Sequence, residues 1–294
     1  MSEAVERRDS WTIQAILQWT TEHFTKRGID TPRLDAELVL AHCLGVERIY
    51  LYTHFDRPLS DEERAALRPL VKRRAAREPV AYILGEREFF SRAFTVTPDV
   101  LIPRPETEHL VETVLKWCEG RALTAPHLID VGTGSGAIAL TLACELPEAH
   151  CTACDISPAA LAVARQNAER HGVSERVDFV ESDLFGAIEV GSAFDVVVSN
   201  PPYVDTALRP GLEPEVRDYE PATALFADDD GLAVARRLCA DAAQFTKPGG
   251  LFLLEFDDAQ HDRVRGYLEA GPWTAIESIF DLQGLRRGLR AERE

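Results

Sequence analysis

The stretch L-I-D-V-G-T-G-S-G, residues 128–136, runs from an apolar segment into three closely spaced glycines. Leu128–Val131 has the apolar, partly β-branched makeup of a short strand. The glycines after it permit a tight turn and let a ligand approach the backbone where the next helix begins. This order predicts the first strand, turn and helix of an α/β sheet, with a ligand site at the turn.

The rest of the second half of the chain repeats this alternation. Short apolar runs are separated by segments with helix start signals, such as Ser157-Pro158. The other predicted strands are 151–155, 177–180, 194–198, 251–255 and 276–280. Strands that alternate with helices indicate a mostly parallel, doubly wound sheet, in which ligands bind beyond the carboxyl ends of the strands.

The first hundred residues follow a different pattern. Residues 10–77 carry repeated helix start signals, among them Thr31-Pro32 and the capping box Ser60-x-x-Glu63. From Val80–Leu84 onward the composition becomes β-rich, which predicts a hairpin. We therefore predict three segments: a helical domain over residues 1–78, a β-hairpin linker over 79–102 and an α/β domain over 103–294.

Composition and charge limit the classes of partner. No apolar run approaches the ~18 residues of a membrane span, and the first residues lack an apolar signal core, so we expect a cytoplasmic protein. Of the formal net charge of −17, residues 100–294 carry −16, a field that repels the phosphate backbone of nucleic acids. One basic helical face, from Arg64 to Arg77, fits either an acidic or RNA partner or a solvated surface.

Six cysteines are scattered over the chain. Cys151-x-x-Cys154 has the spacing of half a zinc site, but no second Cys/His pair stands at ligand spacing. Residues three apart in a strand also point to opposite faces. We therefore expect structural cysteines and no metal.

The glycine turn alone does not identify its ligand. Gly132-x-Gly134-x-x-Ala137 also matches a dinucleotide fingerprint, and a turn that only joins strand to helix remains a third interpretation. Asp155, at the end of the next predicted strand, would accept ribose hydroxyls from either cofactor. The spacing G-T-G-S-G resembles motif I of the Rossmann-like methyltransferases. Their ligand, S-adenosylmethionine, is a sulfonium without phosphate and suits an acidic domain.

A second motif, S-N-P-P-Y-V at residues 199–204, follows a predicted strand and reaches the same sheet edge. The proline after Asn200 biases that residue to extended geometry, and Pro201 and Pro202 have carbonyls but no N–H groups. We predict a stiff acceptor site made by the Asn200 amide oxygen and the Pro201 carbonyl, with Tyr203 as a flat packing face. Asn-Pro is also a common turn signal, so a turn without function is the alternative.

Two acceptors and an aromatic face suit a planar NH2 group. The lone pair of such a nitrogen is delocalised, and holding both N–H bonds favours pyramidalisation and directs the lone pair at a methyl group on sulfur. Positioning of this kind contributes roughly 7–11 kcal/mol. The nitrogen loses its proton readily after it gains the methyl group. We therefore expect direct in-line transfer without a covalent enzyme intermediate.

The chain resembles the peptide chain release factor glutamine methyltransferases, the PrmC/HemK family, over nearly its full length. The motifs that carry the resemblance are Thr31–Glu37, Pro79–Gly85, Leu101–Glu108, Asp130–Gly136, Asn200–Tyr203, Glu220-Pro221 with Ala224-Leu225, and Asp281-Leu282-x-Gly284-x-x-Arg287. The resemblance implies an α/β fold: a Rossmann-like class I S-adenosylmethionine-dependent methyltransferase domain with a small N-terminal helical domain and a linking β-hairpin. Asp257 departs from the family, which usually has glycine near this position, and leaves the local turn open.

The implied activity is methyl transfer from S-adenosylmethionine to the side-chain amide nitrogen (N5) of the glutamine in the Gly-Gly-Gln motif of class I peptide chain release factors. The helical domain would dock the release factor, and we expect a monomer with no direct nucleic-acid substrate. The implied cofactor-binding residues are Gly132, Thr133, Gly134, Ser135 and Gly136 at the methionine end, Asp155 at the ribose, Asp183 and Leu184 near the adenine, and Asn200. The implied catalytic residues are Asn200, Pro201 and Tyr203, and the glutamine amide would contact Asn200, Pro201, Pro202 and Tyr203. Phe89, Phe90, Arg104 and Glu106 either line the pocket or support the domain junction.

Two other functions share parts of this pattern. An adenine-N6 or other exocyclic-amine nucleic-acid methyltransferase would have the same turn and the same Asn-Pro-Pro-Tyr corner. It should add a basic groove or a target-recognition domain, and residues 1–99 carry a net charge of only −1. An NAD-binding or non-catalytic regulator would need residues 200–203 to be only a turn.

Overall fold

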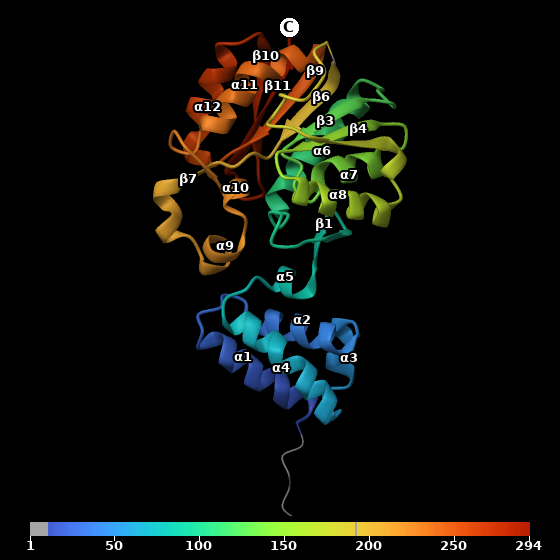
Figure 1. Cartoon of the computed structure of the whole chain (residues 1–294), viewed down its shortest axis with the longest axis vertical. Coiled ribbons are helices and arrows are strands. Elements are labelled where there is room, and N and C mark those ends of the chain that lie inside the picture. Colours follow the sequence, from blue (N-terminus) through green and yellow to red (C-terminus); the bar gives the residue numbers. More distant parts are fainter. Residues whose placement is uncertain (1–10, 192) are drawn as a thin grey trace, which may run out of the picture. The chain divides into compact units, whose positions relative to one another are not determined.

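The computed structural model describes residues 11–191 and 193–294. They form two compact units, whose elements are labelled in Figure 1. The first unit runs up to Gly85 and also includes Pro214–Tyr219, and the second comprises Glu86–Glu213 and Glu220–Glu294. Within the described ranges, no helix is both long and apolar enough to cross a membrane.

Short helices make up the first unit. They are α1 (Ile13–Thr25), α2 (Pro32–Leu44), α3 (Arg48–Thr53), α4 (Asp61–Ala75), α5 (Val80–Leu84) and α9 (Pro214–Tyr219). Two of them begin at the predicted signals, because Pro32 is the first residue of α2, and Ser60 and Glu63 form the capping box of α4. Apolar side chains of α1, α2 and α4, such as Phe24 and Leu40, form one core.

Residues 80–84 form the helix α5, so the strand that their β-rich composition predicted is wrong. Val80 and Ile83, three residues apart, both pack against the core of the first unit, and only a helix brings such a pair to one face. Gly85 ends the helix with a φ of 78°. The contact with the core therefore outweighs the local β-propensity.

The hairpin within residues 79–102 is confined to two four-residue strands. β1 (Glu86–Phe89) pairs antiparallel with β2 (Arg92–Thr95). The turn residue Phe90 has a φ of 49° and donates its backbone N–H to the Glu108 carboxylate at 2.8 Å. This contact stabilises a turn that contains no glycine.

The helix α9 belongs to the first unit although its chain neighbours on both sides belong to the second. Buried Arg74 pairs with Asp35 at 2.6 Å and with Glu215 of α9 at 2.8 Å. Arg77 pairs with the other carboxylate oxygen of Glu215 at 2.7 Å. The helical unit is thus built from two separate parts of the sequence, and part of its basic stretch forms internal ion pairs.

A seven-stranded sheet in the order β10-β11-β9-β6-β3-β4-β5 is the centre of the second unit. The strands are β3 (His127–Val131), β4 (His150–Asp155), β5 (Val177–Glu181), β6 (Phe194–Ser199), β9 (Thr246–Glu255), β10 (Trp273–Phe280) and β11 (Arg286–Arg293). The strands β5, β4, β3, β6 and β9 are parallel, whereas β11 runs antiparallel to both β9 and β10. The structure confirms every predicted strand of this sheet and adds β11.

Helices cover both faces of this sheet, as Figure 1 shows. The helices α6 (Glu108–Gly120), α7 (Ala137–Glu145) and α8 (Pro158–His171) pack on one face, and α11 (Ala233–Phe245) and α12 (His261–Glu269) pack on the other. Successive strand residues contact opposite cores, Leu128 one and Ile129 the other. Cys151 packs in the same core as Leu128, and Cys154 packs in the same core as Ile129. Both cysteines are buried free thiols.

Shorter elements surround the carboxyl edge of the sheet. They are β7 (Val204–Asp205), which pairs parallel with β8 (Phe226–Ala227), the helix α10 (Ala222–Leu225), and 3₁₀ turns at Pro105–Thr107, Thr206–Gly211 and Asp258–Gln260. A further 3₁₀ turn, Ser174–Arg176, directly precedes β5 and therefore lies at the opposite, amino edge. Because β3, β4 and β6 are parallel, their carboxyl ends meet at the carboxyl edge. The glycine turn, Asp155 and Asn200 therefore lie at the same edge of the sheet, as predicted.

Candidate active site

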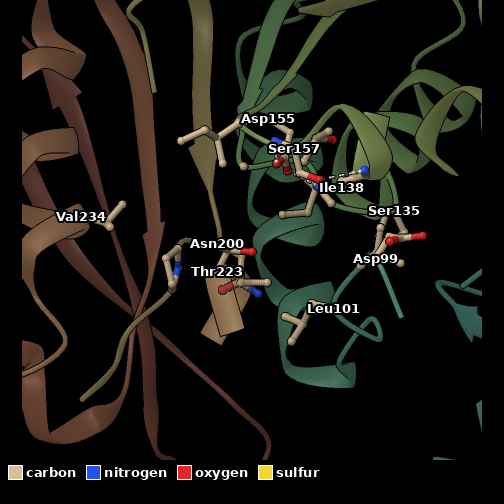
Figure 2. A pocket seen from close by; sticks show the side chains of 18 of the residues that line it. Asp99, Leu101, Ser135, Ile138, Asp155, Ser157, Asn200, Thr223 and Val234 are labelled. Atoms are coloured by element: carbon tan, nitrogen blue, oxygen red, sulfur yellow. Dashed lines mark hydrogen bonds between the residues drawn. The ribbon is translucent and has the colours of Figure 1, made fainter. Parts of the chain in front are cut away.

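A pocket of about 390 Å³ lies at the carboxyl edge of the sheet, and Figure 2 shows side chains that surround it. Its walls come from the ends of β3, β4 and β6, the loop after β5 and the segment before α6. Of the sequence-predicted residues, Gly132, Thr133, Gly134, Ser135, Asp155, Asp183, Leu184, Asn200 and Pro202 line it, whereas Gly136, Pro201 and Tyr203 lie outside the lining. The parts of the predicted site that are far apart in sequence thus surround one cavity.

The glycine turn after β3 is held against β4. The backbone N–H groups of Gly132 and Thr133 both donate to the Cys154 carbonyl, at 2.8 and 2.9 Å. Gly132 and Gly134 have φ angles of 79° and 56°, in the left-handed region that favours glycine. No described atom lies within 4 Å of the Cβ positions at these two glycines. The turn therefore presents bare backbone to the pocket. At Gly136 a Cβ would lie only 2.7 Å from a side chain of α7, so this glycine serves helix packing.

Asp155 ends β4 with both carboxylate oxygens engaged. Its Oδ2 accepts the backbone N–H of Gly134 at 2.9 Å, and its Oδ1 accepts the backbone N–H of Ser157 at 2.9 Å. Burial raises the pKa of this carboxyl, and the backbone N–H groups of Ser157, Gly134 and Ile156 oppose the rise. A carboxylate has about four lone-pair sites, so Asp155 can also accept a hydroxyl donor of a ligand.

Asp130 is a functional candidate that the sequence analysis placed in the glycine motif without a role. Its Oδ2 accepts the Thr133 hydroxyl at 2.7 Å and the backbone N–H of Ala139 at 3.2 Å. Its Oδ1 is buried with no hydrogen-bond partner among the described residues. Burial raises the pKa of Asp130 to about 7. A carboxyl within an otherwise apolar strand was the sequence signal that could have identified it.

The corner after β6 places Asn200 in the pocket wall, as Figure 2 shows. Ser199 ties this corner to β3, because its hydroxyl donates to the Val131 carbonyl at 2.6 Å. The Nδ2 group of Asn200 donates to the Thr107 hydroxyl oxygen at 3.0 Å. None of the described residues donates a hydrogen bond to Asn200 Oδ1. The amide oxygen is therefore available as an acceptor.

The backbone beyond this corner is held by close contacts. Pro201 is buried and Tyr203 is half-buried, and burial raises the pKa of the Tyr203 phenol. The Tyr203 carbonyl accepts Gln260 Nε2 at 2.8 Å. A Cβ on Gly231 would lie only 2.1 Å from that same carbonyl oxygen. The Tyr203 peptide thus passes directly over Gly231, which leaves little freedom for the Asn-Pro-Pro-Tyr corner.

Asp257, the departure from the family pattern, does not disturb its turn. Its φ of −75° and ψ of 143° are extended angles that any L-residue adopts. Its side chain accepts the backbone N–H of Ala259 at 3.0 Å, and Gln260 completes a capping box. Glycine is therefore not required here.

The segment before α6 forms another wall and is held by the buried side chain of Glu220. This carboxylate accepts the backbone N–H of Ile102 at 3.2 Å and pairs with Arg104 at 2.5 Å. Of the four residues whose roles were left open, Arg104 lines the pocket, whereas Phe89, Phe90 and Glu106 do not. Phe89 lies in the core, 1% exposed, so its packing role is the one that the structure supports.

The loop after β5 contributes Asp183 and Leu184. Asp183 pairs with Arg237 of α11 at 2.9 Å, and both also line the pocket. Leu184 has a φ of 53°, and its carbonyl accepts the Ser182 hydroxyl at 2.7 Å. Several lining residues that were not predicted as site residues come from other elements, namely Asp99, Leu101, Thr107, Ile138, Thr223 and Val234. No local motif marks most of them, because they meet only after folding.

The chain matches known protein families and curated relatives over most of its length. Residues 15–85 match the family described as PrmC N-terminal domain, and residues 107–209 match the family described as Methyltransferase small domain. The release factor glutamine methyltransferase of Rhodopirellula baltica is 42% identical over 286 residues, which cover 96% of this chain and 97% of that protein. The enzyme of the same name from Geobacter sulfurreducens is 45% identical over 282 residues, with coverage of 96% and 97%.

Solved structures share the fold at low sequence identity. The hMettl16 catalytic domain, in complex with a hairpin of the MAT2A 3'UTR, is 14% identical with a TM-score of 0.56, and the match covers 92% of this chain and 90% of that one. A 16S rRNA methyltransferase from Thermus thermophilus, in complex with AdoMet and guanosine, is 20% identical with a TM-score of 0.51, and the match covers 71% and 50%.

The solved structures and the curated relatives both agree with a methyltransferase site at this pocket. The structural neighbours show the methyltransferase fold, and the curated relatives are 42% and 45% identical over almost the whole chain. The chain therefore belongs to the family of release factor glutamine methyltransferases, which are S-adenosylmethionine-dependent protein glutamine methyltransferases.

Proposed function

We propose that the enzyme methylates the side-chain amide nitrogen, N5, of the glutamine in the Gly-Gly-Gln motif of class I release factors, by direct in-line transfer. The observation that carries this proposal is the state of the Asn200 amide. Its NH2 group is engaged by Thr107 at 3.0 Å, and its oxygen, on the pocket wall, has no donor among the described residues. A fixed acceptor at this place suits an incoming amide N–H.

The Asn200 corner orients the substrate amide. Asn200 Oδ1 accepts one N–H bond and the Pro201 carbonyl accepts the other, since neither Pro201 nor Pro202 has an N–H group of its own. The nitrogen lone pair is then directed into the pocket. Tyr203 lies outside the lining, so we assign it to packing against the flat amide only when the substrate has entered. Pro202, which lines the pocket, is the nearer contact.

The opposite part of the pocket fits S-adenosylmethionine. The bare backbone of Gly132 and Gly134 leaves room for the methionine end, and Asp155 retains acceptor capacity for the ribose hydroxyls. Asp183 and Leu184 would border the adenine. When bound, the cofactor supplies an electrophilic methyl group on a positively charged sulfur. The acidic residues of the pocket, Asp155 and Asp183, favour a positively charged ligand over one that carries a phosphate.

No strong base is needed before transfer. An amide nitrogen becomes acidic once it carries the extra methyl group, so its proton leaves to water or to any weak acceptor afterwards. The task of the chain is therefore to position the amide and to exclude alternative orientations, which contributes roughly 7–11 kcal/mol in favourable cases.

We also infer that the first unit docks the release factor. A groove of about 630 Å³ between α1 and α4 combines exposed aromatic side chains, Trp11 and Trp19, with the basic side chains of Arg68 and Lys72. This combination suits an apolar surface with acidic neighbours on a protein partner. A nucleic-acid substrate fits less well, because the chain as a whole carries −17. We expect the enzyme to act as a monomer in the cytoplasm.

Mass spectrometry tests the proposal. A bacterial class I release factor is incubated with enzyme and S-adenosylmethionine, and its peptides are sequenced. We expect a gain of one methyl group on the glutamine of the Gly-Gly-Gln peptide, lost when that glutamine is replaced by asparagine. Methylation at another site, or of DNA or RNA in parallel reactions with labelled cofactor, would refute it.

A further inference from the structure

Thr107 stands between the catalytic corner and a buried carboxyl of the neighbouring strand. It accepts Asn200 Nδ2 at 3.0 Å. Burial raises the pKa of Glu255, at the end of β9, and the nearby Thr107 side chain opposes that rise. We propose that the Thr107 hydroxyl donates to Glu255, and that the two are positioning residues that hold the Asn200 amide with its oxygen toward the substrate. This inference rests on the proposed function and explains how its acceptor is kept in place.

The three side chains come from distant parts of the chain. Thr107 closes the turn before α6, Asn200 follows β6, and Glu255 ends β9, the parallel neighbour of β6. In the register of that pair Ser199 lies opposite Leu254, so the next residues, Asn200 and Glu255, leave the sheet side by side. Thr107 is 4% exposed and Glu255 is 3% exposed, which limits the water that can compete for their hydrogen bonds.

The direction of the hydrogen bonds follows from counting protons. A threonine hydroxyl has one proton, and an ionised carboxylate can only accept. When Glu255 is ionised, the proton of Thr107 goes to Glu255, and the hydroxyl oxygen is left with lone pairs alone. Of the two ends of an asparagine amide, only the NH2 end can donate to a lone pair. Asn200 must then turn its Oδ1 away from Thr107.

Without this pair the two amide orientations would be nearly equivalent. The oxygen and NH2 ends of an asparagine have almost the same shape, so packing alone does not distinguish them. The flipped amide would present two donors to a substrate that itself offers N–H bonds. Such a site keeps only the Pro201 carbonyl as an acceptor for the glutamine amide, so the pair controls whether a bound substrate is oriented for attack.

Glu255 is a costly residue to bury, which argues for a specific role. Its Oε2 has no hydrogen-bond partner among the described residues. The charged and titratable groups near it are Glu106 and Arg104 from the segment before α6, Arg287 of β11 and Tyr203 of the corner. Burial raises the pKa of Glu255 to about 7, and Thr107 and the two arginines oppose that rise. Protonated Glu255 could donate to Thr107 and so permit the flipped amide.

Replacement of Thr107 tests the inference. Thr107→Val keeps the shape and removes the hydroxyl, and Thr107→Ser keeps the hydroxyl. We expect Thr107→Val to lower kcat for release factor by roughly ten- to a hundredfold, with the Kd for S-adenosylmethionine by calorimetry unchanged. Thr107→Ser should restore kcat to about a third of wild type or better. The matched control is Thr141→Val, which removes the hydroxyl of a fully buried threonine in α7 whose oxygen has no partner within the described ranges.

A second variant keeps the test valid if Thr107→Val does not fold. Glu255→Gln keeps the shape but removes the ionisation. We expect its kcat to fall and the acid limb of the wild-type kcat profile, near pH 7, to disappear. A Thr107→Ser variant as impaired as Thr107→Val, a Thr107→Val variant no slower than the control, or an unchanged profile for Glu255→Gln would each overturn the inference. The clamp itself is judged separately, by the activity and the cofactor affinity of Asn200→Ala.

Discussion

Asn200 is the residue on which the chemistry depends most directly. Removing its amide should affect the transition state far more than the cofactor complex, because the cofactor is held by the glycine turn and by Asp155. We expect Asn200→Ala to lower kcat by roughly a hundredfold or more, with an unchanged Kd for S-adenosylmethionine. Single-turnover methyl transfer and calorimetry measure the two quantities.

The control for this prediction is a variant with the opposite profile. Asp155→Ala removes an acceptor placed for the ribose and also frees the backbone N–H groups of Gly134 and Ser157, which it holds at 2.9 Å. It should weaken cofactor binding. If Asn200→Ala loses cofactor affinity to the same extent as Asp155→Ala, Asn200 belongs to the cofactor site and the substrate clamp is wrong.

Asp130 should leave a signature in the pH dependence of stability. Its pKa is raised from 3.8 to about 7 in the folded protein, so between these values the folded state holds a proton that the unfolded state has lost. Stability contributed by the neutral form is therefore lost as pH rises through this window, by up to ~1.4 kcal/mol per pH unit. Asp130→Asn removes the ionisation.

The measurement is the free energy of unfolding in urea, at pH values from about 4 to about 8, for both proteins. We expect the advantage of the wild type over Asp130→Asn to shrink as the pH rises. Glu255 and the surface carboxyls titrate in both proteins and cancel in the difference. A difference that stays constant over this range would mean that Asp130 is ionised throughout.

Among the secondary-structure elements, the corner after β6 is held in place by its contact with Gly231. Gly231 has a φ of 81°, and a Cβ there would lie 2.1 Å from the Tyr203 carbonyl oxygen. Gly231→Ala must therefore displace the Tyr203 peptide in addition to straining its own backbone. We expect a lower melting temperature and a kcat reduced by about tenfold or more, since small displacements of a positioning group are costly.

Gly172 at the end of α8 provides the matched control. Its φ of 68° is also in the left-handed region, but no described atom lies within 4 Å of its Cβ position. Gly172→Ala should lose about 1 kcal/mol of stability through backbone strain and keep wild-type kcat. Equal effects of the two variants on kcat would show that the contact with Tyr203 is not used in catalysis.

In the whole molecule, the basic groove on the first unit contrasts with the net negative charge of the chain. The groove between α1 and α4 keeps Lys72 exposed beside Trp19. Lys72→Glu should raise KM for release factor by about threefold or more without changing kcat, and the effect should weaken with added salt. Lys116→Glu, at an exposed lysine of α6, is the control of equal charge. Identical KM values for the two variants would remove the groove as a docking surface.

Elements whose signals are local can be predicted from the amino-acid sequence alone. Strands β3, β4, β5, β6, β9 and β10, the capping box at Ser60 and Glu63, and the motifs at the glycine turn and Asn200 follow from periodicity, turn chemistry and spacing, which neighbouring residues encode. The parallel order of the strands then predicted that Gly132, Asp155 and Asn200 would share one edge.

Features that depend on residues distant in sequence could not be predicted in this way. The helix α5 forms against a core made by other helices, α9 joins the first unit through the carboxylate of Glu215, and Thr107 meets Asn200 across 93 positions of sequence. No local signal marks these pairs, because their energy arises from burial and from hydrogen bonds that exist only when separate segments are brought together. The glycine turn can thus be predicted from adjacent residues, whereas the orientation of the Asn200 amide depends on contacts that only the folded chain makes.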